Sequence, residues 1–194
     1  RLDDPLRRER LALGLRFLQI EHERAKLRRG FSIFDGDDQM AIIKDLATPG
    51  LKNDALYSIQ NLISAAKNNA LSPEQAAEAA RSGREREAAG IYARYQARLQ
   101  AYNAVDFDDL IRLPLTLLEA EPDLAAGWRE RLRYLLVDEC QDTNGAQYRL
   151  LKQLAGPKGN MTCVGDDDQS IYAWRGAQPE NLDQLATDYP NLRV

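Results

Sequence analysis

Two adjacent carboxylates follow a short apolar run in the last third of this 194-residue sequence. The run Leu135-Leu136-Val137 has the length and composition of a buried strand, and Asp138 and Glu139 come directly after it. In sites that hydrolyse nucleotide phosphates, one such carboxylate holds Mg²⁺, usually through water, and the other orients or deprotonates the attacking water. Because successive side chains of an extended chain point to opposite sides, we expect the two acids to have separate tasks. Taken alone, the pattern fits a strand end with two solvated acids equally well.

A second polar run follows another apolar run further along the chain. It extends from Val164 to Ala177 and contains three consecutive aspartates, an amide at Gln169, and the side chains of Tyr172, Trp174 and Arg175. An amide can donate to a phosphate oxygen or position a water molecule. Aromatic rings stack on the bases of a single strand at about 1–3 kcal/mol per base, and a neighbouring cation can pair with phosphate. Considered one at a time, however, these residues are typical of a core, an interface or a solvated turn.

Strands and helices that alternate in this part of the chain set the position of both acidic runs. Such alternation is typical of a parallel, two-sided sheet. Ligands bind at the carboxyl ends of the strands in these sheets, and both acidic runs directly follow a predicted strand. We therefore expect them to share one edge of the sheet. The predicted strands are 133–138 and 160–166, with a third beginning at 192–194, and the predicted helices are 147–154 and 179–189.

The residues up to about 100 have helical patterns instead. To about Arg29 the leucines recur at helical spacing, and residues 33–39 indicate a turn with an aspartate as N-cap of the next helix. From about 39 to 100, apolar faces alternate with breakers, and Ser72-Pro73 has the signature of a helix start. This stretch predicts an all-helical subdomain without strands. Its apolar positions are Met40, Ile42, Ile43, Leu46, Leu56, Ile59, Leu62, Ile63, Ile91, Tyr95 and Leu99.

Composition argues against several classes of protein. The net charge of −4 is unlike that of a protein that coats nucleic acid, and no apolar run reaches the roughly 18 residues of a membrane-spanning helix.

The two cysteines, Cys140 and Cys163, are too few for a disulfide framework and lack metal-ligand neighbours in the sequence. We therefore expect both to pack as apolar residues and the protein to occupy a reducing, cytoplasmic compartment. Asp106, Asp108 and Asp109 are expected to cap the following helix rather than to bind metal.

The two acidic runs together are long and specific enough to indicate a family. The segments Asp138 to Thr143 and Val164 to Ala177 resemble the second and third motifs of superfamily-one DNA helicases of the Rep/UvrD/PcrA type. The similarity is greatest to the Rep branch and extends through Val105 to Leu110 and Phe31 to Asp35. It implies an α/β fold, namely part of a parallel-sheet P-loop (RecA-like) motor domain with an inserted all-helical subdomain. The implied division is a helical lead-in at 1–38, a subdomain like the family's 1B at 39–104, and a motor portion at 105–194.

The resemblance also implies roles for individual residues of the two runs. Asp138 would hold Mg²⁺, Glu139 would be the catalytic base for water, and Gln169 would contact the γ-phosphate of ATP and report its presence. Single-stranded DNA would be met by three side chains of the second run: Tyr172, Trp174 and Arg175.

In the helical subdomain, Lys67 together with Asn68 and Asn69 is a candidate for contacts with the backbone of DNA. Cationic and polar groups suit phosphates, and such contacts position a duplex without reading its sequence. An exposed helix end is an equally good interpretation of these three residues.

Two features depart from the family pattern. Cys140 stands where the family most often has an aromatic tyrosine, which leaves the paired acids untouched but removes a ring. No Gly-x-x-x-x-Gly-Lys-Ser/Thr loop occurs in the sequence, so the backbone cradle and the lysine for the β- and γ-phosphates are missing. We therefore expect the 194-residue chain by itself to bind ATP poorly and to hydrolyse none.

The intact protein implied by the resemblance is an ATP-dependent 3′-to-5′ DNA helicase and translocase, acting in DNA replication or repair. Its cofactors would be ATP and Mg²⁺, and its partners single-stranded DNA and the duplex of a fork. Two alternatives remain open at this stage. One is a motor fragment of a helicase-nuclease of the RecB/AddA type, and the other is an excised module that binds DNA or a protein partner.

Overall fold

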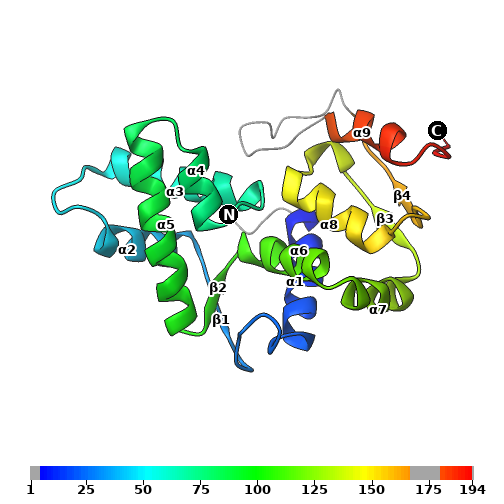
Figure 1. Ribbon diagram of the computed structural model, residues 1–194, viewed down its shortest axis with the longest axis horizontal. Coiled ribbons are helices and arrows are strands. Elements are labelled where there is room, and N and C mark those ends of the chain that lie inside the picture. The colour runs from blue at the N-terminus through cyan, green and yellow to red at the C-terminus, as the bar shows by residue number, and fades with distance from the viewer. Residues whose placement is uncertain (1–4, 167–179, 194) are drawn as a thin grey trace.

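A computed structural model gives the arrangement of the chain and describes residues 5–166 and 180–193, with side chains at 12–166 and 184–193. Gln169, Tyr172, Trp174 and Arg175 therefore lie outside the described residues. Figure 1 shows two lobes side by side, one helical and one in which helices pack beside a small sheet. In the described ranges no helix is both long and apolar enough to cross a bilayer.

The helical lobe has the elements that the sequence predicts. Asp35 accepts hydrogen bonds from two backbone N–H groups of the turn that follows it, and Ser72 accepts one from Gln75 with Pro73 at the start of the helix. These two capping boxes confirm the predicted helix starts. The helices of this lobe are α2 (Gly36–Leu46), α3 (Asn53–Asn68), α4 (Pro73–Ala79) and α5 (Gly83–Ala101).

Apolar faces of three of these helices form the core of the helical lobe. Residues of α2, α3 and α5 pack against one another, and Tyr92 and Tyr95 are the largest side chains with no exposed surface. Burying one large apolar side chain stabilises a fold by about 1.5–3 kcal/mol, so this cluster is a core in its own right. Most of the predicted apolar positions are buried in it: Ile42, Ile43, Leu56, Ile59, Ile63, Ile91, Tyr95 and Leu99. The other three, Met40, Leu46 and Leu62, are partly buried and pack against it.

Two short parallel strands join the ends of the helical stretch. Strand β1 (Ser32–Phe34) pairs with β2 (Ala104–Asp106), with Ile33 opposite Val105. This corrects the prediction of a turn at residues 33 and 34, because three residues are too few for an alternating pattern to stand out. Neither strand lies within residues 39–100, where no strand is predicted. Helices α2 to α5 are thus inserted between two strands that lie side by side (Figure 1).

The second lobe begins with α1 and contains the remaining helices. α1 ends at Ile20, not near Arg29 as the leucine spacing predicts, and turns occupy the residues that follow. The helices of this lobe are α1 (Pro5–Ile20), α6 (Asp109–Ala120), α7 (Pro122–Leu132), α8 (Gly145–Ala155) and α9 (Glu180–Asp188).

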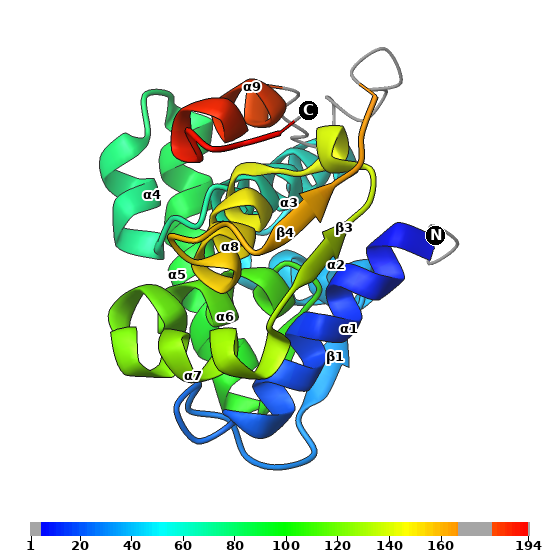
Figure 2. The same cartoon turned by 90° about the vertical axis from the view of Figure 1, so that its right-hand side faces the viewer.

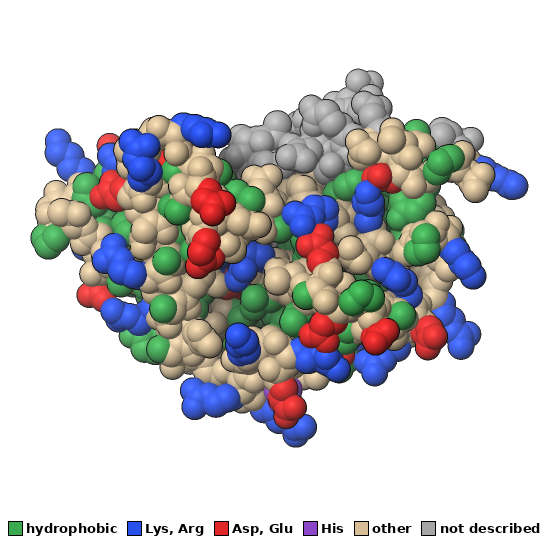
Figure 3. Space-filling view, viewed as in Figure 1, with side chains coloured by type: hydrophobic (Ala, Val, Ile, Leu, Met, Phe, Trp, Pro, Cys, Tyr) green, Lys and Arg blue, Asp and Glu red, His purple; other side chains and the backbone are tan. Residues whose placement is uncertain are grey.

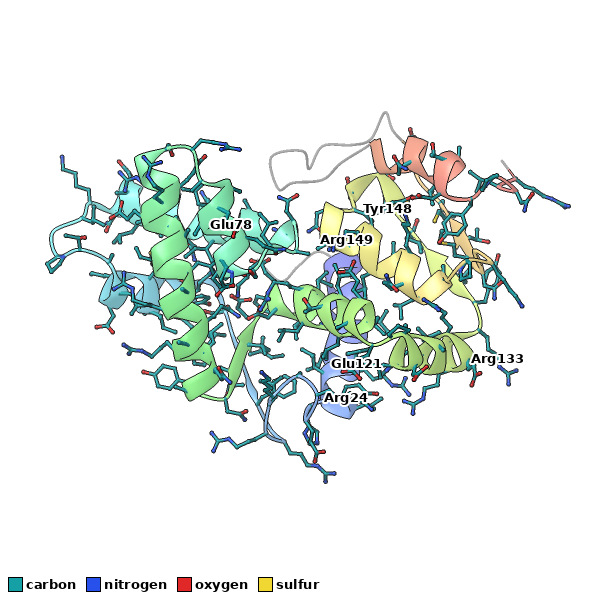
Figure 4. The ribbon with its side chains drawn as sticks, viewed as in Figure 1. Arg24, Glu78, Glu121, Arg133, Tyr148 and Arg149 are labelled. Atoms are coloured by element: carbon teal, nitrogen blue, oxygen red, sulfur yellow. The ribbon has the colours of Figure 1, made fainter. Side chains whose placement is uncertain are left out.

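The core of the second lobe joins α1 to α6, α7 and α8. The rings of Phe17 and Trp128 have centroids 4.6 Å apart, and Leu115 of α6 lies in the same buried cluster. At the rim, Arg24 forms an ion pair with Glu121 between α6 and α7, and Figure 4 shows these two side chains together below α1. The segment after α1 is therefore held against the junction of two later helices.

A parallel strand pair lies against α8 in this lobe. Strand β3 (Leu135–Val137) pairs with β4 (Met161–Cys163), and Val137 is opposite Cys163. Figure 2 shows both arrows pointing towards the same end of the lobe. The two predicted strands and their parallel pairing are confirmed. Residues 192 and 193 have no strand, so the third predicted strand is absent from the part of the chain described.

The two faces of this small sheet differ. Val137 and Cys163 face a cluster with Tyr148 of α8. On the other face Leu136 is 83% exposed and Val164 is 59% exposed. Parallel sheets normally have both faces covered, so the described part of the chain leaves one face of this sheet unusually open.

Candidate functional site

The carboxyl end of β3 places two acids in different surroundings. Asp138 is exposed, whereas Glu139 is partly buried. Glu139 has φ 49° and ψ 52°, the left-handed conformation that a residue with a side chain rarely adopts, and a 3₁₀ turn, η1 (Cys140–Asp142), follows it. The backbone N–H of Glu139 donates to Asp138 Oδ1 over 3.0 Å. The two carboxylates are separated, as expected, but by this turn and not by the alternation of a strand.

Gln141 connects this strand end to the next one. Its side chain has no exposed surface. Its Nε2 donates to Glu139 Oε2 over 2.5 Å, and its Oε1 accepts from the backbone N–H of Asp166 over 3.1 Å. The sequence pattern alone did not indicate a role for Gln141, although this residue stands inside the first acidic run. The available signal is an uncharged polar residue two positions after the paired acids.

Backbone hydrogen bonds extend the pairing of β3 and β4 towards the acids. The N–H of Val164 donates to Val137 O over 2.8 Å, and that of Cys140 donates to Val164 O over 2.9 Å. Gly165 lies so close to Gln141 that a Cβ on it would be 2.7 Å from Oε1. Both acidic runs therefore begin at one edge of the sheet, as predicted, up to Asp166, where the described residues pause.

The cysteines pack beneath this edge. Cys140 is fully buried with Val137 and Tyr148, and its carbonyl accepts from Thr143 Oγ1 over 2.7 Å. Cys163 is partly buried, and a hydrogen bond with Cys140, together with burial, raises the pKa of the Cys163 thiol. Both are free thiols. The prediction of a buried apolar residue is confirmed for Cys140 and only in part for Cys163.

The donor set at the end of β3 suits Mg²⁺ in a nucleotide site. Among the described residues no group of three or more potential ligands is arranged to hold a metal. Mg²⁺ rarely needs such a cage, because it keeps several waters and binds through one or two carboxylates and the phosphates of the substrate. The exposed carboxylate of Asp138 fits that pattern.

Lys67 is placed differently from the sequence expectation. Its side chain has no exposed surface, and Nζ lies 2.6 Å from Asp106 Oδ2 and 3.0 Å from Asp109 Oδ2. Burial opposes the charged form, but the two carboxylates outweigh it and raise the pKa of Lys67. A contact with DNA phosphate would require Lys67 to leave both partners, so the expected DNA contact is corrected to a structural ion pair.

Two of the three aspartates, Asp106 and Asp109, form a buried network with Lys67 at the start of α6. Asp106 Oδ1 accepts from the backbone N–H of Asp109 over 2.9 Å, and Asp106 Oδ2 accepts from Tyr95 Oη over 2.9 Å. Arg112 Nη2 lies 3.0 Å from Asp109 Oδ1. Burial raises the pKa of Asp106, with Asp109 adding to the effect, whereas at Asp109 the cations Lys67 and Arg112 outweigh burial and lower the pKa. The predicted capping role is confirmed for Asp106.

Asp108 faces the helical lobe instead of capping α6. Its Oδ2 accepts from Ser64 Oγ of α3 over 2.7 Å, and it makes no side-chain cap. Burial and the nearby Asp106 raise the pKa of Asp108 to about 6. Asp108 therefore contributes a hydrogen bond to the contact between the lobes. Its charged form is unfavourable there, because burial and the nearby Asp106 oppose ionisation.

A second polar contact runs from α3 to the residue after the first acidic run. Asn144 caps α8 by accepting from the backbone N–H of Gln147 over 2.9 Å, and its Nδ2 donates to Asn68 Oδ1 over 2.8 Å. Ser64, Lys67 and Asn68 all lie in the last part of α3. We call these three residues and their partners Asp106, Asp108, Asp109 and Asn144 the interlobe seam.

The surface charge is mixed. Figure 3 shows basic and acidic side chains interspersed over both lobes on the face that it displays. A broad basic field would be expected of a domain that coats nucleic acid, and this face does not have one.

Comparison of the sequence with known proteins finds one family model and several relatives. Residues 12–190 match the model of the UvrD/REP helicase N-terminal domain. The chain is 47% identical over 185 residues to the ATP-dependent DNA helicase Rep of Escherichia coli (strain K12), covering 94% of this chain and 27% of that protein. It is 38% identical to the ATP-dependent DNA helicase PcrA of Bacillus subtilis (strain 168), covering 94% and 25%. It is 41% identical to the ATP-dependent DNA helicase UvrD1 of Mycobacterium bovis, covering 87% and 24%. The chain thus spans about a quarter of the length of these relatives.

Proposed function

This chain belongs to the UvrD/REP helicase family, and on that premise we propose that it supplies the hydrolytic carboxylates of an ATP-dependent DNA helicase. The observation that carries the proposal is the pair Asp138 and Glu139 at the carboxyl end of β3, beside the end of β4. The complete protein would couple ATP hydrolysis to 3′-to-5′ movement on single-stranded DNA and to unwinding of the duplex at a fork.

The proposed chemistry divides the work between the two acids. Asp138, which is exposed, would hold Mg²⁺ through water, and the bound ion would neutralise charge on the β- and γ-phosphates. Glu139 would orient the attacking water and accept its proton as the water oxygen bonds to the γ-phosphorus, while the bond from that phosphorus to the β–γ bridging oxygen breaks and ADP leaves. The partly buried position of Glu139 and its hydrogen bond from Gln141 support this role, since a base must be held in one orientation.

The second acidic run would pass the state of the nucleotide to DNA. By resemblance, Gln169 would contact the γ-phosphate, and Tyr172, Trp174 and Arg175 would contact single-stranded DNA. The short distance in sequence between Gln169 and Trp174 supports coupling, because a segment biased by a phosphate can shift a nearby stacking residue. Lys67 has no part in this proposal, because it is buried in the interlobe seam.

The chain by itself would not hydrolyse ATP. The sequence has no phosphate-binding loop of the Walker type, and the open face of β3 and β4, with Leu136 and Val164 exposed, fits a sheet that other parts of a larger protein cover. An ATPase rate above background for this chain, abolished by Glu139→Gln, would contradict the proposed inactivity.

We keep the division 1–38, 39–104 and 105–194 as a proposal, which the pairing of β1 with β2 across the helical stretch supports.

The decisive experiment replaces Glu139 in the complete protein. Glu139→Gln should lower DNA-stimulated ATPase by about 10²- to 10⁴-fold, the usual contribution of a general base, and leave ATP binding in place. Glu78→Gln is the matched control, because Glu78 is exposed on α4 in the helical lobe (Figure 4). Near-normal hydrolysis by Glu139→Gln would reject the proposal. Duplexes with a 3′ or a 5′ single-stranded tail test the direction, and unwinding only of the 5′-tailed duplex would reject the 3′-to-5′ assignment.

A further inference from the structure

Gln141 forms hydrogen bonds both to Glu139 and to the backbone of Asp166, the residue that follows Gly165. We propose that Gln141 is a positioning residue, which orients the Glu139 carboxylate and ties it to the backbone at the end of β4. This inference rests on the proposed function, because it takes Glu139 as the base. It adds a residue through which the geometry of hydrolysis depends on the position of the second strand end.

The amide of Gln141 has one favourable orientation. Nε2 faces the carboxylate of Glu139, which only accepts, and Oε1 faces the N–H of Asp166, which only donates. A flipped amide would put an oxygen against the carboxylate and an NH₂ group against the N–H, and would lose both bonds. The 2.5 Å bond to Glu139 is short, as is typical of a hydrogen bond to an ionised acceptor. The two partners therefore determine the orientation of the amide together.

The surroundings of Gln141 leave little room for it to move. The side chain is fully buried, and Oε1 lies where a Cβ on Gly165 would be only 2.7 Å away. The backbone beneath it is fixed by the bond from the Cys140 N–H to Val164 O. Interiors of this density change between discrete arrangements and do not deform smoothly. A displacement of the backbone at Asp166 would thus break the bond to Oε1 or move the whole amide, and with it Glu139.

This connection predicts a coupling between DNA and the catalytic base. Asp166 stands three residues before Gln169 in the sequence, so it leads into the run that we propose to sense phosphate and DNA. Changes in that run would reach Glu139 through Gln141, a single side chain. Without the amide, Glu139 would still be present but would lose its fixed orientation and its dependence on the end of β4.

Two substitutions of similar size in the complete protein test this role. Gln141→Met removes both hydrogen bonds and should lower kcat for ATP by about 10- to 100-fold, as the loss of an orienting neighbour typically does, with KM for ATP changed less than threefold. The ratio of DNA-stimulated to basal ATPase should fall as well.

Gln141→Glu places a second carboxylate against Glu139, so the two share a proton. The acidic limb of the pH profile of kcat should therefore move to higher pH. Gln100→Met and Gln100→Glu are matched controls, since Gln100 is exposed near the end of α5.

The outcomes separate a positioning role from a structural one. A side chain that only fills space would alter thermal stability and leave kcat and the DNA stimulation of a folded Gln141→Met unchanged. A wild-type kcat and DNA stimulation for a folded Gln141→Met, or a wild-type pH profile for Gln141→Glu, would overturn the inference. If Gln141→Met does not fold, kcat and the DNA stimulation of Gln141→Glu decide the matter, because an ionised glutamate at this position cannot donate to Glu139. Full activity of Glu139→Gln would instead reject the proposed function, whereas an inactive Glu139→Gln with unaffected Gln141 variants would reject this inference alone.

Discussion

Lys67 of α3 and Asp106 of β2 form an ion pair inside the protein, with 2.6 Å between Nζ and Oδ2. The pair joins the helical lobe to the strand that leads into the second lobe. Taking two charges out of water is unfavourable, and only their mutual attraction and further hydrogen bonds, here from Tyr95 and the Asp109 backbone, offset it. The interlobe seam is therefore sensitive to the loss of any single charge.

Replacing Lys67 should destabilise the fold strongly. Lys67→Met leaves the carboxylates of Asp106 and Asp109 buried without their cation, and the free energy of unfolding in urea should fall by about 3–5 kcal/mol. Adding Asp106→Asn, which removes one of the stranded charges, should recover part of this loss. Lys44→Met is the control, because Lys44 is exposed on α2, and it should change stability by less than about 0.5 kcal/mol. Equal effects of the two lysine substitutions would contradict the buried ion pair.

Asp108 should make the stability depend on pH. The pKa of Asp108 is raised to about 6 in the folded protein, so the native state binds more protons than the unfolded chain between about pH 4 and pH 6. The contribution of Asp108 to the free energy of unfolding therefore falls as the pH rises through this range. Asp108→Asn should be more stable than the wild type at pH 8, by on the order of 1 kcal/mol after solvent screening, and the difference should vanish near pH 4. A difference independent of pH would refute the assignment.

The contact between Asn68 and Asn144 should appear as a coupling energy. Asn144→Ala removes the cap of α8 and the bond to Asn68, whereas Asn68→Ala removes that bond and a 3.4 Å hydrogen bond to Ser64 Oγ. A double-mutant cycle on the free energy of unfolding should give a coupling of about 0.5–1.5 kcal/mol. Asn69→Ala serves as the control partner, because the side chain of Asn69 bonds within its own helix, to Ala65 O. Its effect should add to that of Asn144→Ala without coupling.

Gly165 should be sensitive to a single added methyl group. A Cβ at this position would lie 2.7 Å from Gln141 Oε1, so Gly165→Ala should push the amide away and destabilise the protein by about 1–3 kcal/mol. Gly127→Ala on the exposed side of α7, where nothing lies within 4 Å of the added carbon, should instead stabilise by roughly 0.5–1 kcal/mol. In a Gln141→Ala background the penalty at Gly165 should largely disappear. A penalty that persists there would show that the crowding has another source.

Local sequence patterns predicted helices and strands well where a capping motif or an apolar pattern lies within one helix or strand. The helix starts after Asp35 and Ser72, the apolar faces of α2, α3 and α5, and the strands that precede both acidic runs are all as expected. The pattern failed where an element has only three residues, as at β1, and where α1 ends, since the leucine spacing continues into turns. Caps and amphipathic faces are local properties, whereas the end of a helix and the pairing of a short strand depend on distant residues.

The sequence by itself determined the family, the helical stretch followed by strands β3 and β4, and the paired acids Asp138 and Glu139 as the candidate centre of hydrolysis. Only the tertiary structure decided what Lys67 and Gln141 do. Lys67 looks like a surface cation at a helix end, and Gln141 looks like one polar residue among several, until folding buries both. Each then takes partners from elsewhere in the chain, because a polar group removed from water must be satisfied inside the protein. Which distant carboxylate or backbone N–H satisfies it is set by packing and cannot be read from sequence spacing.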